Sequence, residues 1–169
     1  MSTTNTSFSS SASINAAIVP QLGNSNQYSD IFPATEAQLE IWLSSKQGIE
    51  ANCAYNEITS LRIGGDLNVE ALQNALQKLL QRHDALRATF SPDGSQMRVV
   101  EEMDVAFEFV DWSGENQDAA DAKRLQLVQQ QACLPFDLEN GPLFRAVLQN
   151  LSNGLSFLTV AAHHIVLDG

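Results

Sequence analysis

Apolar positions recur along this chain with two spacings, one typical of helices and one typical of strands. The helical spacing is clearest after Asn68, a good N-cap residue that is followed by Glu70 in the first turn. The apolar stripe of this helix consists of Val69, Leu72, Ala75, Leu76, Leu79 and Leu80. Two further helices are predicted, one over 36–46 behind the cap residue Thr35 and one over 116–132.

Strands are predicted where apolar residues run together or alternate with polar ones. The predicted strands span 56–63, 87–90, 96–101, 105–111, 143–151 and 155–163. Turn residues at 91–94 and at 152–154 join two pairs of these strands as hairpins. Because helices and strands interleave among hairpins, we expect a two-layer α/β (α+β) sandwich in which helices flank a mixed β-sheet.

The first 29 residues differ in composition from the rest of the chain. They are rich in Ser, Asn, Thr and Gln, and the first charged side chain is that of Asp30. A secretory signal needs a basic start with an apolar core, and a transit peptide needs arginines; both features are missing. Residues 1–29 are therefore interpreted as a flexible polar leader, with a short docking segment as the alternative. Residues 30–169 are expected to form the ordered domain.

Charge and hydropathy exclude several classes of function. The formal net charge is -11 and the pI is near 4.4. Nucleic acids and anionic membranes select clustered Lys and Arg, so neither is an expected partner. No segment approaches the apolar length of a membrane span, and a cytoplasmic protein is expected. Cys53 and Cys133 lack a CxxC spacing and are expected to be reduced, partly buried thiols.

The most suggestive chemistry lies in the run from His163 to Gly169. A buried strand leads into two adjacent histidines, and Asp168 lies four residues beyond His164. Adjacent side chains on a strand point to opposite faces, so the two imidazoles do not readily share an ion, and no metal site is predicted. Divided roles fit better, with one imidazole able to accept a proton in a cleft and the other facing the sheet interior. Purely structural histidines remain the alternative.

Four segments, in order, resemble the signatures of one known family. They read TEAQLEIWL over 35–43, RHDALRATF over 82–90, PFDLENGPLFR over 135–145 and HHIVLDG over 163–169. The last matches the HHxxxDG motif that is shared across the chloramphenicol-acetyltransferase-like acyltransferases. The other three are similar to signatures of the condensation domains of nonribosomal peptide synthetases. By this resemblance the chain is the N-terminal lobe of such a domain.

The resemblance implies an activity and its partners. Members of the family are pseudo-dimers of two similar lobes with the active site between them, so the C-terminal lobe is expected to be absent from this chain. They form an amide bond between an upstream acyl or peptidyl thioester and a downstream aminoacyl thioester. Both substrates are carried on the phosphopantetheine arms of carrier proteins, which are the implied partners, and no directly bound cofactor is expected.

The resemblance also assigns roles within the last motif. His164 corresponds to the active-site histidine, acting as a base or by positioning the amine, and His163 supports it structurally. Asp168 is expected to brace the structure through an arginine, for which Arg87 is the candidate. Gly169 allows close approach of the backbone.

Several alternatives stay open. Within the superfamily these are a starter condensation domain, an epimerisation domain and an acyltransferase with an alcohol acceptor. From a different class, the chain is a non-catalytic lobe that only docks carrier proteins. The parent protein is expected to be an acyltransferase, whereas the chain alone is expected to be inactive.

Overall fold

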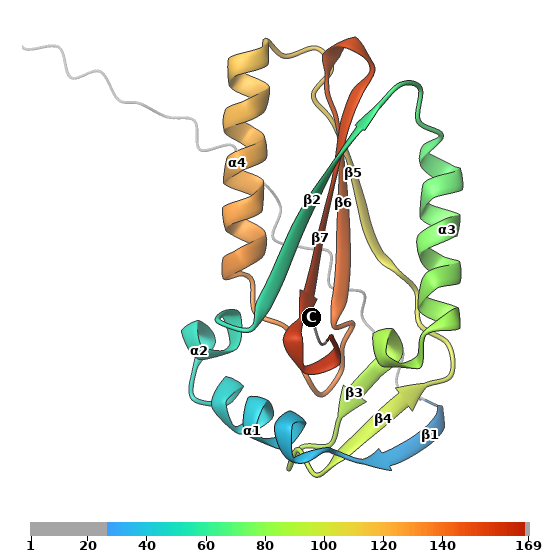
Figure 1. Ribbon diagram of the computed structural model, residues 1–169, viewed down its shortest axis with the longest axis vertical. Helices are drawn as coiled ribbons and strands as arrows, with labels where there is room; N and C mark the ends of the chain where they lie inside the picture. Colours follow the sequence, from blue (N-terminus) through green and yellow to red (C-terminus); the bar gives the residue numbers. More distant parts are fainter. Residues whose placement is uncertain (1–26, 168–169) are drawn as a thin grey trace, which may run out of the picture.

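The computed structural model describes residues 27–167, which form two β-sheets and the helices around them (Figure 1). The four-stranded sheet has the order β2 (Asn56–Gly64), β7 (Leu155–His163), β6 (Phe144–Asn150), β5 (Ala106–Asp111). The three-stranded sheet has the order β1 (Tyr28–Pro33), β4 (Gln96–Val100), β3 (Ala88–Phe90). Strands β5 and β6 are parallel and the other neighbours are antiparallel, which confirms the predicted mixed sheet.

The helices begin and end close to their predicted bounds. They are α1 (Glu36–Ser45), α2 (Ile49–Cys53), α3 (Val69–Arg82) and α4 (Gln117–Cys133), with short 3-10 turns η1 (Asp84–Arg87), η2 (Ser152–Gly154) and η3 (His164–Val166). Thr35 and Asn68 cap α1 and α3 as predicted, each by accepting a backbone N–H of the first turn. Helix α2 was not predicted, because its five residues are too few to show a periodic apolar stripe. Within 27–167 no helix combines the length and apolarity that a membrane crossing requires.

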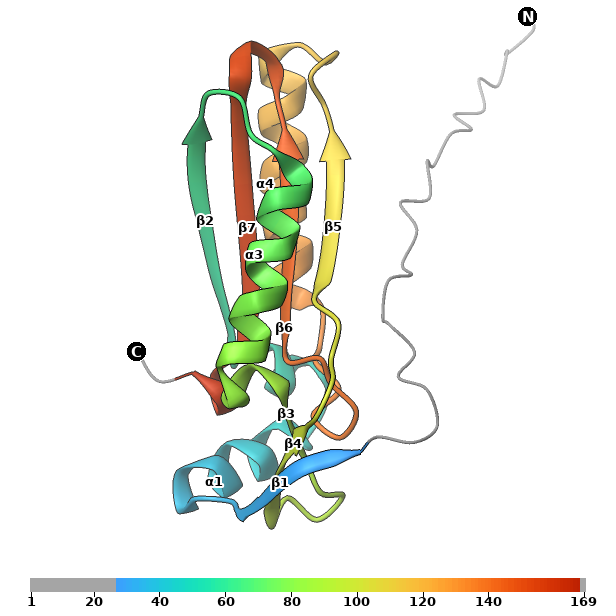
Figure 2. The ribbon, with the colours of Figure 1, turned by 90° about the vertical axis from the view of Figure 1, so that its right-hand side faces the viewer.

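Helices α3 and α4 cover opposite faces of the four-stranded sheet (Figures 1 and 2). Leu76 and Leu80 of α3 are buried in one cluster with Leu158 of β7. Adjacent Phe157 points to the other face, where the guanidinium of Arg124 in α4 lies 4.6 Å from its ring centroid. The expected sheet flanked by helices is confirmed, with three layers here where the sequence indicated two. The α3 face of the central strands is apolar, whereas the α4 face includes the buried polar side chains of Gln149 and Thr159.

Strand β1 corrects the predicted boundary of the polar leader. Tyr28 and Ser29 were assigned to the leader, but both belong to β1, which pairs with β4. Most of β1 is exposed, so its sequence shows no alternating pattern, and only the partner strand reveals it. Residues 1–26, and with them the leader or docking interpretation, lie outside the described part of the chain.

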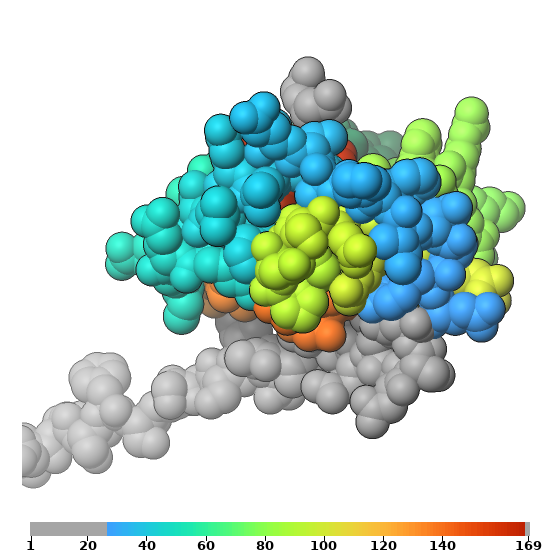
Figure 3. Space-filling view, turned by 90° about the horizontal axis from the view of Figure 1, so that it is seen from below, coloured from blue at the N-terminus to red at the C-terminus, as the bar shows by residue number. Residues whose placement is uncertain are grey.

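The predicted hairpin turn at 91–94 is confirmed and lies between α1 and β1 at one end of the molecule (Figure 3). Gly94 has φ +72° and donates its N–H to the Ser91 carbonyl at 2.8 Å. The Asp93 carboxylate accepts hydrogen bonds from the hydroxyl of Ser91 (2.5 Å) and the backbone of Ser95 (3.1 Å). These bonds lower the pKa of Asp93 to about 2, so the turn is held by an ionised carboxylate at neutral pH.

Candidate functional site

The two adjacent histidines lie in different environments at the end of β7. His163 is the last residue of the strand and is fully buried, whereas His164 opens η3 with its side chain 40% exposed. The position is fixed by β2, because His163 is in register with Asn56 and the His164 N–H donates to the Tyr55 carbonyl at 2.8 Å. The predicted difference between one interior and one accessible imidazole is thus confirmed, and the cleft that the second was expected to face stays a prediction.

His163 holds the turn that presents His164. Its Nδ1 accepts the backbone N–H of Ile165 at 3.3 Å, inside η3. Its Nε2 lies 3.4 Å from the hydroxyl oxygen of Ser45, which itself donates to the Ile41 carbonyl at 2.8 Å. With the Ser45 proton engaged elsewhere, Nε2 is the donor, and the ring is neutral with its proton on Nε2.

Burial keeps His163 neutral. Loss of solvent is the main cause that lowers the pKa of this imidazole from 6.5 to about 4. A hydrogen bond with the Asn52 backbone raises the pKa, and the nearby charges of His164 and Arg145 lower it further. Phe136 packs edge-on against the ring, with centroids 6.0 Å apart. A protonated His163 would lose the acceptor that caps η3, so the neutral form is the one that fits the structure.

This arrangement makes the fold sensitive to acid. The unfolded chain binds a proton at His163 near pH 6.5 and the folded chain only near pH 4, so the free energy of unfolding falls as pH falls through this window. At about 1.4 kcal/mol per pH unit, the loss reaches roughly 3 kcal/mol by pH 4. Urea unfolding at pH 7, 5.5 and 4.5 measures this decrease in the free energy of unfolding.

The matched variants are His163→Asn and His83→Asn. Asparagine at 163 does not titrate, and its Oδ1 can still accept the Ile165 N–H, so the difference in unfolding free energy between pH 7 and 4.5 should shrink. His83 is exposed, so its replacement should leave the pH dependence unchanged. An equal pH dependence in wild-type protein and His163→Asn would contradict the prediction.

The four segments that carry the family resemblance meet around η3. TEAQLEIWL forms most of α1, RHDALRATF runs through η1 into β3, and PFDLENGPLFR is the loop that enters β6. The bonds that join them are Gln38 Nε2 to Ile165 O (3.3 Å), Phe90 N to Leu138 O (2.7 Å) and His163 N to Leu143 O (3.0 Å). Segments that are far apart in sequence therefore support one short turn.

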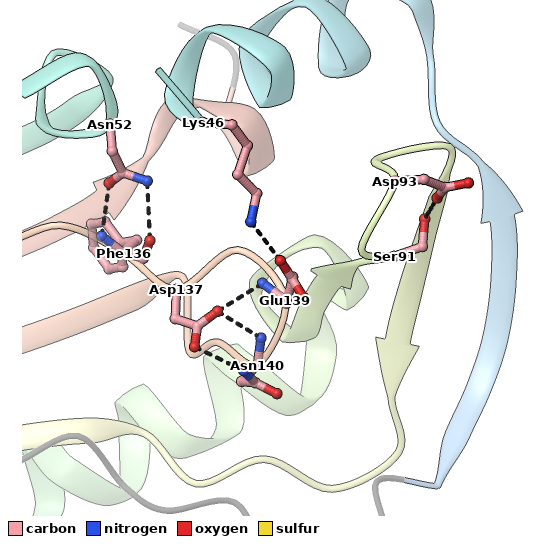
Figure 4. A network of polar contacts seen from close by, with 8 residues as sticks. All are labelled: Lys46, Asn52, Ser91, Asp93, Phe136, Asp137, Glu139 and Asn140. Atoms are coloured by element: carbon pink, nitrogen blue, oxygen red, sulfur yellow. Dashed lines mark hydrogen bonds and ion pairs between the residues drawn. The ribbon is translucent and has the colours of Figure 1, made fainter. Parts of the chain in front are cut away.

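The loop that precedes β6 is fixed by polar contacts (Figure 4). Asn52 of α2 is buried, accepts the N–H of Phe136 at 2.9 Å and donates to its carbonyl at 3.1 Å. Asp137 accepts the backbone N–H groups of Glu139 (3.0 Å) and Asn140 (3.2 Å). Asn52 could not be recognised from the sequence, because a single asparagine in a short helix carries no periodic signal.

Arg145 secures the end of α4 from within β6. Its guanidinium lies 3.9 Å from the Phe136 ring centroid and donates to the carbonyls of Gln131 (2.8 Å) and Leu134 (2.7 Å). Burial lowers the pKa of Arg145 to about 10, which still leaves it charged at neutral pH. The cation thus satisfies carbonyls at a helix C-terminus, where positive charge is favourable. The sequence shows Arg145 only as the end of a motif.

Arg87 is held by groups close to it in sequence and by β4. It is buried, and Nη2 lies 2.8 Å from the Asp84 carboxylate. The remaining donors bind the carbonyls of Leu80, Gln81 and Val100. Asp168 and Gly169 lie outside the described residues, so the pairing of Arg87 with Asp168 stays a prediction.

Metal ligands and cysteine thiols are the other groups in the chain that could carry chemistry. Among residues 27–167, no cluster of three or more His, Cys, Asp or Glu side chains could hold a metal ion. Cys53 and Cys133 are both free; Cys53 is partly buried as expected, but Cys133 is exposed at the end of α4. Burial raises the pKa of the Cys53 thiol, which makes it a poor nucleophile.

Comparisons with known proteins agree with the four motifs. The family model described as Condensation domain matches residues 28–169. A linear gramicidin synthase of Brevibacillus parabrevis is 34% identical over 140 residues, which is 81% of this chain and 3% of that protein. A surfactin synthase of Bacillus subtilis (strain 168) is 31% identical over 143 residues, 84% of this chain and 4% of that protein.

Solved structures show the same fold. The starter condensation domain of rhizomide synthetase RzmA matches 83% of this chain with a TM-score of 0.74 and 24% identity, over 35% of its own length. A four-domain nonribosomal peptide synthetase bound to AMP and glycine matches 84% of this chain with a TM-score of 0.69 and 20% identity, over 11% of its length. This chain thus spans about a third of one solved condensation domain and a few per cent of the curated synthetases. The family match, which covers most of the chain, shows that it belongs to the condensation-domain family of nonribosomal peptide synthetases.

Proposed function

We propose that this chain is the first lobe of a condensation domain that forms an amide bond between two thioester-bound substrates. The observation that supports this most directly is the accessible imidazole of His164, which follows a buried strand on a turn held by His163. A rigid support of this kind keeps a reacting group within the narrow geometry that catalysis needs.

The reaction requires one bond to form and one to break. The amine nitrogen of the downstream aminoacyl thioester attacks the carbonyl carbon of the upstream thioester, the C–N bond forms and the C–S bond breaks. The proton that the amine loses passes to His164 and from there to the departing thiolate. Near pH 8 an α-amino group is already partly neutral, so His164 serves either as a base or by holding the amine in line for attack. An imidazolium N–H can also donate a hydrogen bond to the oxyanion of the tetrahedral intermediate.

The other residues of the motif have supporting roles in this proposal. His163 fixes η3, Asp168 braces the turn through Arg87, and Gly169 allows close backbone approach. The substrates arrive on phosphopantetheine arms of upstream and downstream carrier proteins, so no cofactor needs to be bound by the chain itself. The 40% exposure of His164 supports the need for a second lobe as the opposite wall of the site.

A carrier-to-carrier transfer assay tests the proposal. The synthetase that contains this chain is given a panel of acyl-loaded donor carriers and aminoacyl-loaded acceptor carriers. Intact-mass analysis should show the donor acyl group on the acceptor through a base-stable amide, and residues 1–169 alone should give no product. Transfer by residues 1–169 alone would refute the need for a second lobe. Three results would overturn the assignment as an amide-forming domain. These are an ester product, inversion of the acceptor stereocentre without acyl transfer, and a complete protein that gives no product.

A further inference from the structure

We propose that Glu57 is a positioning residue for His164, whose Nδ1 proton it holds so that Nε2 is free to accept the proton of the amine. This inference rests on the proposed function, in which His164 handles that proton. Glu57 lies in none of the four segments that carry the family resemblance.

The strand register places Glu57 on the same face of the sheet as His164. On β2 and β7, which are neighbours in the sheet (Figure 2), Asn56 is paired with His163 and Glu57 with Ala162. Side chains alternate between faces, so Asn56 and His163 share one face, and Glu57 and Ala162 share the other. His164 follows the strand as the first residue of η3, and its bond to the Tyr55 carbonyl continues the pairing with β2, which brings its side chain beside Glu57.

The side-chain atoms confirm that these neighbours meet. Oε1 of Glu57 lies 3.5 Å from Nδ1 of His164. This distance is longer than a standard hydrogen bond, and contacts of this kind commonly tighten when a substrate fills the site. The Glu57 side chain is 62% exposed and therefore free to make that small movement. The backbone bond from His164 to the Tyr55 carbonyl keeps the two residues in place during it.

The contact selects one tautomer of His164. A carboxylate only accepts hydrogen bonds at neutral pH, so the nitrogen that faces it carries the proton. With the proton on Nδ1, the lone pair lies on Nε2, where it can accept the proton of the amine. This tautomer is the opposite of that of His163, whose Nδ1 is the acceptor.

The charges around His164 single out Glu57 among the described residues. His163, its neighbour in the chain, is neutral and buried. Arg145 on β6 is paired with Ala161, so its guanidinium lies on the His163 face of the sheet. Glu57 of β2 is the acidic group that faces His164 within ion-pair distance in the part of the chain that the structure describes.

NMR of the chain itself tests the contact without any substrate. Two-bond ¹H–¹⁵N correlation spectra of ¹⁵N-histidine-labelled protein report which ring nitrogen is protonated. At pH 8, His164 should show the Nδ1–H form in the wild type and in Glu57→Asp, and should shift to the Nε2–H form, which free imidazole prefers, in Glu57→Ala. His163 should show Nε2–H throughout and serves as an internal reference. Glu108→Ala, which removes a partly exposed glutamate of edge strand β5, should leave His164 unchanged. An unchanged tautomer in Glu57→Ala would overturn the inference.

Kinetics of the complete condensation domain separate this inference from the proposed function. Glu57→Gln keeps an acceptor but removes the charge, so kcat should fall about tenfold with KM for both loaded carriers unchanged, and Glu57→Asp should recover most of the loss. An unchanged kcat in Glu57→Gln, in a wild type that condenses, would remove Glu57 from the mechanism. A wild type that fails to condense while the tautomer still shifts would overturn the proposed function and leave the contact intact.

Discussion

Replacing His164 with alanine in the synthetase that contains this chain should lower the rate of amide formation by about 10²–10⁴-fold, the contribution typical of a positioned acid–base group. The effect is expected on kcat, since the imidazole acts on the proton of the attacking amine and does not hold the carrier proteins. Single-turnover transfer between preloaded carriers measures it directly. The side chain is 40% exposed, so its loss should leave the melting temperature nearly unchanged.

His83→Ala is the matched control for His164→Ala. His83 is exposed beyond the end of α3, and its replacement should leave the rate of amide formation within about twofold of the wild type, as expected for a surface change. A His164→Ala enzyme that keeps more than about a tenth of the wild-type rate would limit the imidazole to a minor role. An equal loss in both variants would point to general damage to the fold.

The contrast between the two histidines could be predicted from the sequence, but the neighbour of His164 could not. The alternation of side chains along a strand predicts one interior and one accessible imidazole, although His164 itself lies in η3, just beyond β7. The approach of Glu57 depends on the register in which β2 pairs with β7, about a hundred residues away in the chain. A shift of one residue would place Glu57 on the other face, and no local pattern fixes that register.

The fold shows the same division between local and long-range information. Helix α3 was predictable because Asn68 caps it and its apolar stripe has helical spacing. Neither strand β1 nor the role of Arg145 was predictable, because each depends on a distant partner. Strand β1 pairs with β4, and Arg145 binds the carbonyls at the end of α4. The polar groups that hold the site are therefore less visible in the sequence than the apolar groups that build the core.

The contact between Gly94 and Trp42 should make Gly94→Ala strongly destabilising. Gly94 has φ +72°, and a Cβ atom there would lie 2.4 Å from Cδ2 of the Trp42 indole. Trp42 is buried in the cluster with Phe90 and Phe136, so the rigid ring cannot move aside without disturbing that core. Backbone strain of about 1 kcal/mol and overpacking of about 1–3 kcal/mol together lower the free energy of unfolding by about 2–4 kcal/mol.

Gly154→Ala separates backbone strain from overpacking. Urea unfolding of the two variants measures the loss in the free energy of unfolding of each. Gly154 has φ +65°, close to that of Gly94, but an added Cβ would meet its nearest atom at 3.9 Å, an ordinary contact. It should therefore show only the backbone strain of about 1 kcal/mol. Equal losses in the two variants would mean that the indole yields to the methyl group. A larger loss in Gly94→Ala would show that Trp42 is fixed in place. Trp42 belongs to α1, the helix whose Gln38 and Ser45 contact η3 and His163.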